Sequence, residues 1–469
     1  MAGRGGVILA AGLGTRMKSR LPKVLHPVGG RPMVVRAVQA LQGLGSLDQL
    51  VVVASPENAS AIEELLNGQV EVVVQEKPLG TGHALMVAEE ALRSLDELIL
   101  IYGDMPLLRS EDIQFLLDAV RKAEEDGPRP QAALLSFDAP SPRGYARVLR
   151  DPQGNLLRLV EEVEATPEEK AITEVNAGVY WFRSVTLWPV LRRVKPSPRK
   201  GEYYLTDVFA DLVQGGHRVV VAQGSDHRSF IGVNDRLALS QAEAWCRQRT
   251  LEALMEKGVT VEDPITTYVE EGVEVGPDTV LRPGTFLEKG TVIGSSCIIG
   301  PGAHIIASRV GDGCRIWYST VEESQVGDGV TIGPYSHVRP GCHLEAGVEV
   351  GNFAELKKAY VGSGTKIHHH SYLGDARLGP RVNIGAGVIT VNYDGYRKYT
   401  TEIGEGAFIG CNVNLLAPRI IGKGAIIGAG STITEDVPDD SLGIARERQV
   451  TKPGWAARWR KAQEERQKR

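Results

Sequence analysis

The sequence predicts two consecutive domains: an α/β domain with a mostly parallel sheet, followed by a parallel β-helix of six-residue repeats. Three observations support this fold class. The 469 residues exceed the roughly 250–300 residues at which a single hydrophobic core stops growing. Short apolar runs alternate with helix-like stretches up to about residue 233. Beyond residue 258, aliphatic residues recur at every sixth position over long stretches.

The first domain is predicted to span residues 1–233. Its apolar runs are short enough for buried strands, and the stretches between them have helical spacing, a pattern typical of parallel α/β sheets. The predicted strands are Val7–Ala11, Leu50–Ala54, Val70–Val74, Leu98–Tyr102 and Ala132–Phe137, and clear helices are Pro32–Leu44 and Ser110–Ala123. Residues 234–258 form a predicted linker helix, which Gly258 ends.

The second domain is predicted to span residues 259–454. One coil of such a helix buries too little to be stable, so many coils must stack. The repeat breaks between Ile384 and Ile403, where the segment Thr390–Thr401 is polar and rich in turn-forming residues. We expect this segment to be a loop that forms one wall of a binding site. The repeating positions are Leu281, Leu287, Ile293, Ile299 and Ile305; Val326, Ile332, Val338, Leu344, Val350 and Leu356; Val361, Ile367 and Leu373; and Ile403, Ile409, Leu415, Ile421, Ile427 and Ile433.

Composition narrows the class of protein. Hydrophobic residues make up 42% and charged residues 24%, and a net charge of −5 argues against a dedicated nucleic-acid binder. The five cysteines form no C-x-x-C pair, which favours a reducing compartment over a disulfide framework. No signal peptide and no run of about 20 apolar residues is seen, so we expect a soluble cytoplasmic protein with no membrane partner.

A glycine-rich segment, Leu9–Met17, follows the first predicted strand. Its backbone N–H groups suit phosphates, but it lacks the third glycine of a dinucleotide fingerprint and the Gly-Lys-Ser/Thr of a P-loop. Lys23, after Pro22, adds a cation. The whole run resembles the sugar nucleotidyltransferases, whose signature is Gly-x-Gly-Thr-Arg-Met followed by Pro-Lys. The alternative is a glycine-rich turn with a solvated lysine.

Two further segments extend the resemblance. Gln75 with Gly80–Ala84 is similar to that family's base-binding segment, and Tyr102–Leu107 is similar to its metal-binding strand end. Asp104 ends an apolar strand, where parallel sheets bind ligands, and Mg²⁺ prefers oxygen ligands. An amino-terminal helix cap is the alternative for Asp104. The match is closest to the bifunctional enzymes that form UDP-N-acetylglucosamine.

For the first domain, the resemblance implies a Rossmann-like nucleotidyltransferase that joins N-acetylglucosamine 1-phosphate to UTP and releases pyrophosphate. Arg16 and Lys23 would be catalytic cations, and Asp104 and Asn234 would bind Mg²⁺. Ala177 stands where the family usually has threonine. The implied substrate contacts are Leu9, Gly12, Lys23, Gln75, Gly80, Thr81, Gly144, Glu161, Asn176 and Asn234.

Within 60 residues of the second domain lie motifs that resemble the same family's acetyltransferase site. They are Arg339–Gly341, Gly351–Lys358, His368–His370, Tyr372–Asp375, Asn383–Gly387 and Asn392–Gly395. N-acetylation needs a base, and histidine suits that role near neutral pH. Neighbouring strand residues point to opposite faces, so the three histidines cannot all bind one metal ion. The alternative is that these histidines are simply exposed and have no catalytic role.

The resemblance assigns roles in this left-handed helix. His369 would be the base, Glu355 would hold its imidazolium, and Arg339 and Lys357 would bind the sugar phosphate. Tyr372, Asn383 and Asn392 would orient the sugar or the base, with Asn392 counted among the catalytic residues. Cys411 stands where serine is usual and is a weaker hydrogen-bond donor. The implied acetyl-CoA contacts are Ala386, Asn392, Tyr393, Cys411, Ala429 and Arg446.

The combined prediction is a bifunctional enzyme that acetylates glucosamine 1-phosphate and then uridylylates the product, which feeds peptidoglycan and lipopolysaccharide precursors. The resemblance also implies a homotrimer. The basic tail, residues 455–469, covers the coenzyme phosphates or is simply a solvated end. One alternative is a single-function nucleotidyltransferase whose helix only oligomerises. Another keeps both activities with a different sugar or base.

Overall fold

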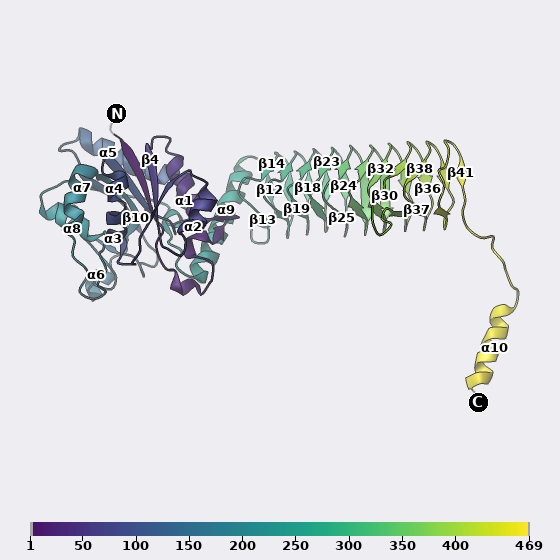
Figure 1. Ribbon diagram of the computed structural model, residues 1–469, viewed down its shortest axis with the longest axis horizontal. Helices are drawn as coiled ribbons and strands as arrows, with labels where there is room; N and C mark the ends of the chain where they lie inside the picture. The colour runs from purple at the N-terminus through teal and green to yellow at the C-terminus, as the bar shows by residue number, and fades with distance from the viewer. Residues whose placement is uncertain (1–2, 468–469) are drawn as a thin grey trace. The chain divides into compact units, whose positions relative to one another are not determined.

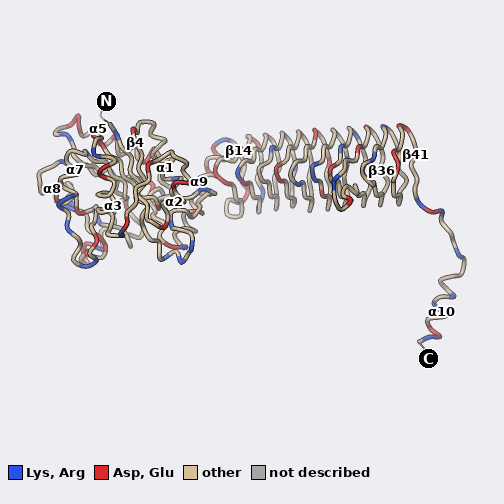
Figure 2. Tube along the Cα trace, in the orientation of Figure 1, with Lys and Arg blue, Asp and Glu red and all other residues tan. Residues whose placement is uncertain are grey.

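The computed structural model describes residues 3–467, so residues 1–2 of the first predicted domain and 468–469 of the predicted tail lie outside it. Two compact units share the chain, residues 1–249 and 250–469. Figure 1 shows a sheet flanked by helices in the first unit and a long stack of short strands in the second. Lysine and arginine are interspersed with aspartate and glutamate along both units (Figure 2).

The first unit is built on a nine-stranded sheet. Strands β1, β4, β5 and β6 run parallel, while β10 is antiparallel to β6 and β7. The main order is β11-β7-β10-β6-β1-β4-β5. The strands are β1 (Arg4–Leu9), β4 (Gln49–Ala54), β5 (Glu71–Val74), β6 (Glu97–Tyr102), β7 (Ala132–Asp138), β8 (Arg147–Arg150), β9 (Leu156–Val160), β10 (Glu174–Arg183) and β11 (Val219–Gln223); β2 (Pro27–Val28) and β3 (Arg31–Pro32) pair separately.

Helices cover both faces of this sheet because alternate strand residues are apolar on both sides. One core packs Ile8 and Val52 against α1, α2 and α5, and the other packs Val7 and Val51 against α3, α7 and α8. The helices are α1 (Met33–Gln42), α2 (Ala59–Leu66), α3 (Thr81–Val87), α4 (Glu89–Leu92), α5 (Ser110–Glu125), α6 (Pro167–Lys170), α7 (Ser184–Leu191) and α8 (Asp207–Gln214), with short η1 (Thr15–Met17), η2 (Lys23–Leu25) and η3 (His227–Phe230).

Helix α9 (Arg236–Glu256) follows where the linker helix is predicted. Ala242 and Cys246 on its first half are buried in the first unit, against Val28 and Val233. Leu251 and Leu254 on its last turns belong to the apolar core of the second unit. A helix with apolar side chains buried at both ends is held by packing rather than by helix propensity.

The second unit is a three-faced parallel β-helix, in which each face is one parallel sheet. Face 1 holds β12 (Thr260–Val261), β15 (Val280–Leu281), β18 (Ile298–Ile299), β21 (Arg315–Ile316), β24 (Thr331–Ile332), β27 (Glu349–Asn352), β30 (Lys366–His369), β33 (Asn383–Ile384), β36 (Phe408–Ile409), β39 (Ile426–Ile427) and β41 (Leu442–Gly443).

Face 2 holds β13 (Tyr268–Val269), β16 (Phe286–Leu287), β19 (His304–Ile306), β22 (Thr320–Glu322), β25 (His337–Val338), β28 (Glu355–Lys357), β31 (Tyr372–Gly374), β34 (Ile389–Val391), β37 (Asn414–Leu416) and β40 (Thr432–Ile433). Face 3 holds β14 (Glu274–Val275), β17 (Val292–Ile293), β20 (Arg309–Val310), β23 (Gln325–Val326), β26 (His343–Leu344), β29 (Tyr360–Val361), β32 (Ala376–Leu378), β35 (Thr401–Ile403) and β38 (Arg419–Ile421).

The aliphatic residues at the predicted six-residue spacing are buried and form one continuous core along the helix. Each face contributes one inward side chain per coil, which is the physical origin of the repeat. The break in the repeat is a loop over residues 392–400. Thr390 lies on β34 and Thr401 on β35, both fully buried, so the loop is shorter than the predicted segment. After the β-helix, the α-helix α10 (Trp455–Gln467) has no buried residue.

Candidate functional sites

The topology of the first unit gathers three predicted site segments at one edge of its sheet. Gly12 follows β1, Gln75 follows β5 and Asp104 follows β6, and these strands are parallel. Their carboxyl ends therefore meet at the same edge, which is where open α/β sheets bind ligands. Leu9 is the last residue of β1, and Arg16 lies exposed in η1, within the same glycine-rich loop.

Lys23 packs across the glycine-rich loop. A Cβ at Gly14 would lie 2.6 Å from the Lys23 Cβ, and one at Gly12 would lie 3.6 Å from the Lys23 Nζ. Gly14 also has a φ of 61°, a conformation that favours glycine. The segment therefore needs a glycine at position 14 to bring the lysine side chain close to the loop backbone, whereas a Cβ at Gly12 would only make an ordinary contact.

The two predicted metal ligands point at one spot. Lys23 Nζ donates to Asp104 Oδ2 at 2.5 Å and to Asn234 Oδ1 at 3.2 Å. The Val233 N–H donates to the Asp104 carbonyl at 2.8 Å, which ties the two segments together. Two oxygens that converge on one cation fit a divalent ion that takes its remaining ligands from phosphate and water. Among residues 3–467, no cluster of three or more His, Cys, Asp or Glu side chains could hold a metal by itself.

The predicted base-binding segment is held in shape by hydrogen bonds. Gln75 is buried, and its Nε2 lies 3.1 Å from the Gly80 carbonyl and 2.9 Å from His83 Nδ1. Thr81 Oγ1 accepts from the Leu205 N–H at 3.0 Å. Residues 75–83 are thus fastened to residues 203–205, part of the run predicted to hold the sugar.

Buried polar groups line the predicted sugar region. Thr206 donates to Glu161 at 2.9 Å, and burial of the Glu161 carboxyl raises its pKa. Asn176 donates to the Tyr180 hydroxyl at 2.5 Å, and burial raises the pKa of Tyr180 to about 12. The Gly144 N–H donates to Glu162 at 2.8 Å. Ala177, the departure from the family pattern, packs into the core beside the sheet.

Four of the predicted acetyl-site residues, Arg339, Glu355, Lys357 and Tyr372, fall on neighbouring coils of face 2. Glu355 and Tyr372 are adjacent in register, and Arg339 donates to Glu355 at 2.7 Å. The register that pairs Val338 with Leu356 also places Arg339 beside Lys357. Carboxylate, phenol and two cations therefore share one outer surface of the helix.

One predicted contact is not present in the structure. We expected Glu355 to hold the imidazolium of His369, but Glu355 binds Arg339 instead. His369 ends β30 on face 1, in register with Asn352, and no hydrogen bond to its ring occurs among residues 3–467. Only two residues lie between Asn352 and Glu355, and within them the chain turns the corner onto face 2.

The other two histidines of the triplet have separate partners. His368 Nε2 lies 2.7 Å from Glu349 Oε2, and this contact lowers the pKa of Glu349. The His370 carbonyl accepts from the Gly387 N–H at 2.9 Å. The His368 ring therefore contacts a residue of the preceding coil of face 1. Its centroid lies 6.2 Å from that of the His369 ring.

The loop 392–400 brings Asn392 to the same region. Its Nδ2 donates to Asp375 Oδ2 at 2.6 Å, and the side chain is buried. A Cβ at Gly374 would lie 2.5 Å from the Tyr372 hydroxyl oxygen and 2.7 Å from Asn392 Nδ2, so these two polar groups flank the glycine. Tyr393 bonds its own loop at the Gly395 carbonyl, 2.6 Å away.

Curated relatives match nearly the whole chain. A protein of Carboxydothermus hydrogenoformans described as bifunctional protein GlmU is 46% identical to this chain, and the match covers 95% of this chain and 98% of the relative. A protein of Exiguobacterium sp. with the same description is also 46% identical, over 96% of this chain and 99% of the relative. Residues 6–151 match the MobA-like NTP transferase domain, and residues 323–358 and 400–435 match the bacterial transferase hexapeptide (six repeats). The chain belongs to the GlmU family.

Membership in the GlmU family confirms the predicted fold class, a Rossmann-like nucleotidyltransferase domain followed by a left-handed β-helix. It also confirms the predicted pair of activities, uridylyl transfer and acetyl transfer, and with them use of a divalent metal and acetyl-CoA. A β-helix that only oligomerises is thereby excluded. None of the helices within residues 3–467 combines the length and apolarity needed to cross a membrane.

Three of the predicted coenzyme residues stack along the corner that joins faces 1 and 2. The pairing of Ile384 with Ile409 and of Ile409 with Ile427 places Ala386, Cys411 and Ala429 on successive coils. The Asn412 N–H donates to the Ala386 carbonyl at 2.7 Å, and the Gly430 N–H donates to that of Cys411 at 2.8 Å. Arg446, another predicted coenzyme contact, is exposed. Asn383, which is predicted to orient the sugar or the base, lies on face 1 beside Lys366.

Sequence reasoning missed Lys398. This residue forms a bridge with Tyr393 across the loop, and its amine lies beside Lys357, whose pKa it lowers. A third cation therefore joins Arg339 and Lys357. The sequence does show a basic residue within the loop that is predicted to form a wall of the site. Only the fold of that loop shows that the Lys398 side chain reaches face 2.

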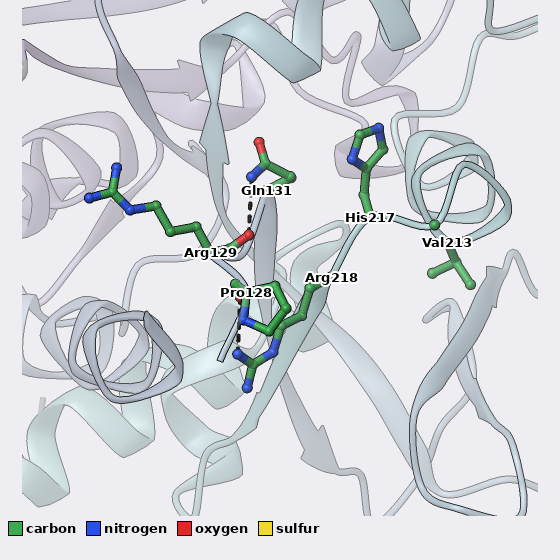
Figure 3. A pocket seen from close by; sticks show the side chains of 7 residues that line it. Pro128, Arg129, Gln131, Val213, His217 and Arg218 are labelled. Atoms are coloured by element: carbon green, nitrogen blue, oxygen red, sulfur yellow. Dashed lines mark hydrogen bonds between the residues drawn. The ribbon is translucent and has the colours of Figure 1, made fainter. Parts of the chain in front are cut away.

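A hollow of about 530 Å³ lies elsewhere, at the amino ends of β7 and β11 (Figure 3). Its Arg218 donates to the carbonyls of Ala123 and Pro128, at 2.6 and 3.1 Å, and so caps the carboxyl end of α5. Gln131 Nε2 donates to the Arg129 carbonyl at 3.1 Å. These polar groups serve the loop structure, and the edge is opposite the one that carries the nucleotide motifs.

Proposed function

We propose that this chain makes UDP-N-acetylglucosamine in two steps. The second unit transfers acetyl from acetyl-CoA to the amine of glucosamine 1-phosphate. The first unit then transfers uridylyl from UTP to N-acetylglucosamine 1-phosphate and releases pyrophosphate. The observation that carries this proposal is the convergence of Lys23, Asp104 and Asn234 beside the glycine-rich loop, in a chain that also carries the acetyl-site residues.

For uridylyl transfer, the protein supplies position and charge rather than a nucleophile. Arg16 and Lys23 neutralise the phosphates, and Gln75 with Gly80 and Thr81 holds the base. Asp104 and Asn234 hold Mg²⁺, which when bound neutralises phosphate charge. Glu161, Asn176 and Gly144 belong to the sugar pocket, where the hydrogen bonds described above fix their orientation.

For acetyl transfer, His369 takes the proton from the attacking amine. The three cations of face 2, Arg339, Lys357 and Lys398, attract the sugar phosphate, which competes with Glu355 for Arg339. Tyr372 and Asn392 lie together and orient the substrate. The corner residues Ala386, Cys411 and Ala429 bind acetyl-CoA, and the Ala386 N–H stabilises the oxyanion.

We further propose a homotrimer that works in the cytoplasm. His369 and Asn383 lie on face 1, whereas the cations lie on face 2, which supports a site completed by a neighbouring helix. Closed cyclic symmetry is the usual way in which such surfaces pair. Sedimentation equilibrium of the full chain tests this assembly, and a stable monomer would contradict it.

One assay tests the proposed function. Glucosamine 1-phosphate, acetyl-CoA, UTP and Mg²⁺ are supplied together, and the products are identified by mass spectrometry. We expect free CoA, pyrophosphate and UDP-N-acetylglucosamine in equal amounts. Substitution of galactosamine 1-phosphate or of dTTP tests the alternative specificities, and a better yield with either would replace the proposed substrate.

A further inference from the structure

The Lys23 ammonium occupies the point on which the two proposed metal ligands converge. It contacts Asp104 at 2.5 Å and Asn234 at 3.2 Å, and both the lysine and the aspartate side chains are largely buried, 10% and 17% exposed. A charge-assisted hydrogen bond of this length is among the strong ones. The carboxylate is therefore already neutralised by a cation that belongs to the protein.

The same lysine also borders the loop that is built for phosphates. Lys23 begins η2, and its Cβ lies where Gly14 leaves no room for a side chain of its own. Its Nζ lies under Gly12. The side chain thus runs along the glycine-rich loop from Gly14, at its Cβ, to Gly12, at its Nζ, and this same Nζ contacts the oxygens of Asp104 and Asn234.

We propose that Lys23 is the resident cation of the metal site, and that a divalent ion binds tightly only when nucleotide phosphates draw the ammonium away. The proposal rests on the assignment of Asp104 and Asn234 as metal ligands. An ammonium and a divalent ion compete for this carboxylate, because like charges repel strongly in a partly buried site. A triphosphate offers oxygens to both cations and so removes the conflict.

The consequence is an order of events in this chain. Lys23 suppresses metal binding in the free protein and then serves as a phosphate ligand once UTP enters. Lys23 is in this sense a positioning residue for the metal as well as a charge for the substrate. Metal affinity, and not only catalysis, then depends on a residue that need not touch the metal.

The test measures Mn²⁺ binding to the full chain without nucleotide, from the electron paramagnetic resonance signal of the free ion. Lys23→Met should bind Mn²⁺ at least about tenfold more tightly than the parent protein, whereas Lys23→Arg, which keeps a cation, should not. Lys18→Met is the matched control, because it removes one positive charge from the exposed end of the same loop. Adding Asp104→Asn to Lys23→Met should abolish the gain. Circular dichroism checks that each variant is folded.

Two outcomes overturn the proposal and are distinguishable. If Lys23→Met binds Mn²⁺ no more tightly than Lys18→Met, while Mn²⁺ with UTP still binds in an Asp104-dependent way, the resident-cation role is wrong and the metal site stands. If Asp104→Asn leaves binding of Mn²⁺ with UTP unchanged, the metal site itself is wrong.

Discussion

Single residues on face 2 set the electrostatics of the acetyl site. Lys357 lies beside Lys398, which lowers the pKa of Lys357, and Arg339 is already engaged by Glu355. Three positively charged side chains in one small area repel one another when no anion is bound. A phosphate dianion would relieve that repulsion, so we expect these residues to bind the phosphate as a set rather than singly.

Lys398→Met tests this set. Its removal should let the pKa of Lys357 rise toward its ordinary value, because the neighbouring amine that opposes its protonation is gone. The phosphate also loses one partner, so we expect KM for glucosamine 1-phosphate to rise about tenfold, since hydrogen bonds to charged groups contribute roughly 1.5–3 kcal/mol. Acetyl-transfer kinetics measure the change. Lys358→Met, an exposed neighbour on β28's turn, is the control, and an unchanged KM in Lys398→Met would refute the role.

Whole elements place the nucleotide motifs, and their close approaches require glycine. Segment 75–83 and segment 203–205 are joined through backbone bonds, with Gly82 N–H donating to the Tyr203 carbonyl at 2.8 Å. Gly80 begins this approach with a φ of 101°. On the β-helix, Gly374 plays a similar part, since no side chain fits between Tyr372 and Asn392.

Gly80→Ala should disrupt the base-binding segment. The new Cβ would lie 2.6 Å from the Tyr203 carbonyl oxygen, and positive φ adds roughly 1–2 kcal/mol of strain. We expect KM for UTP to rise at least about tenfold, with acetyl transfer unaffected. Gly154→Ala is matched, because it also has positive φ but meets no atom within 4 Å. If the two substitutions had equal effects on KM for UTP, backbone strain alone would account for them, and the contact between Gly80 and Tyr203 would have no specific role.

Gly374→Ala should act on the other activity. Its Cβ would push apart the Tyr372 hydroxyl and the Asn392 amide, so acetyl transfer should fall by about tenfold or more, while uridylyl transfer stays at the parent level. The two assays are run on one preparation. Gly347→Ala, at a positive-φ turn in open space, is the control for a glycine substitution elsewhere in the β-helix, and Gly374 itself has no positive φ. Full acetyl activity in Gly374→Ala would mean that Tyr372 and Asn392 do not position the substrate.

At the scale of the molecule, each activity rests on its own unit. The proposed uridylyl residues fall within residues 9–234 and the acetyl residues within 339–446, on opposite sides of the division at residues 249 and 250. In the proposed reaction sequence, N-acetylglucosamine 1-phosphate is the product of the second unit and the substrate of the first. A freely diffusing intermediate would therefore allow two half-active proteins to complete the sequence.

Mixing two variants tests this separation. Asp104→Asn should lose uridylyl transfer by at least about 100-fold and His369→Gln should lose acetyl transfer by a similar factor, each retaining the other activity, as is typical when a metal ligand or a general base is removed. The mixture, given glucosamine 1-phosphate, acetyl-CoA and UTP, should again form UDP-N-acetylglucosamine, measured by liquid chromatography. No product from the mixture would contradict the proposed assignment of one reaction to each unit.

The sequence alone determined the two fold classes and the family, and it predicted the site segments. The alternation of apolar runs with helical stretches and the six-residue spacing are local patterns, and motifs such as Gly12 to Lys23 are contiguous, so both can be read along the chain. Tertiary structure decided which side chains meet. Lys23 reaches Asp104 and Asn234 across 81 and 211 residues, Lys398 reaches Lys357 through the fold of a loop, and Glu355 turns to Arg339 instead of His369. The reason is physical: contacts between distant residues depend on coil register and on corners, which move a residue from one face to the next within three positions and leave no mark in the local pattern.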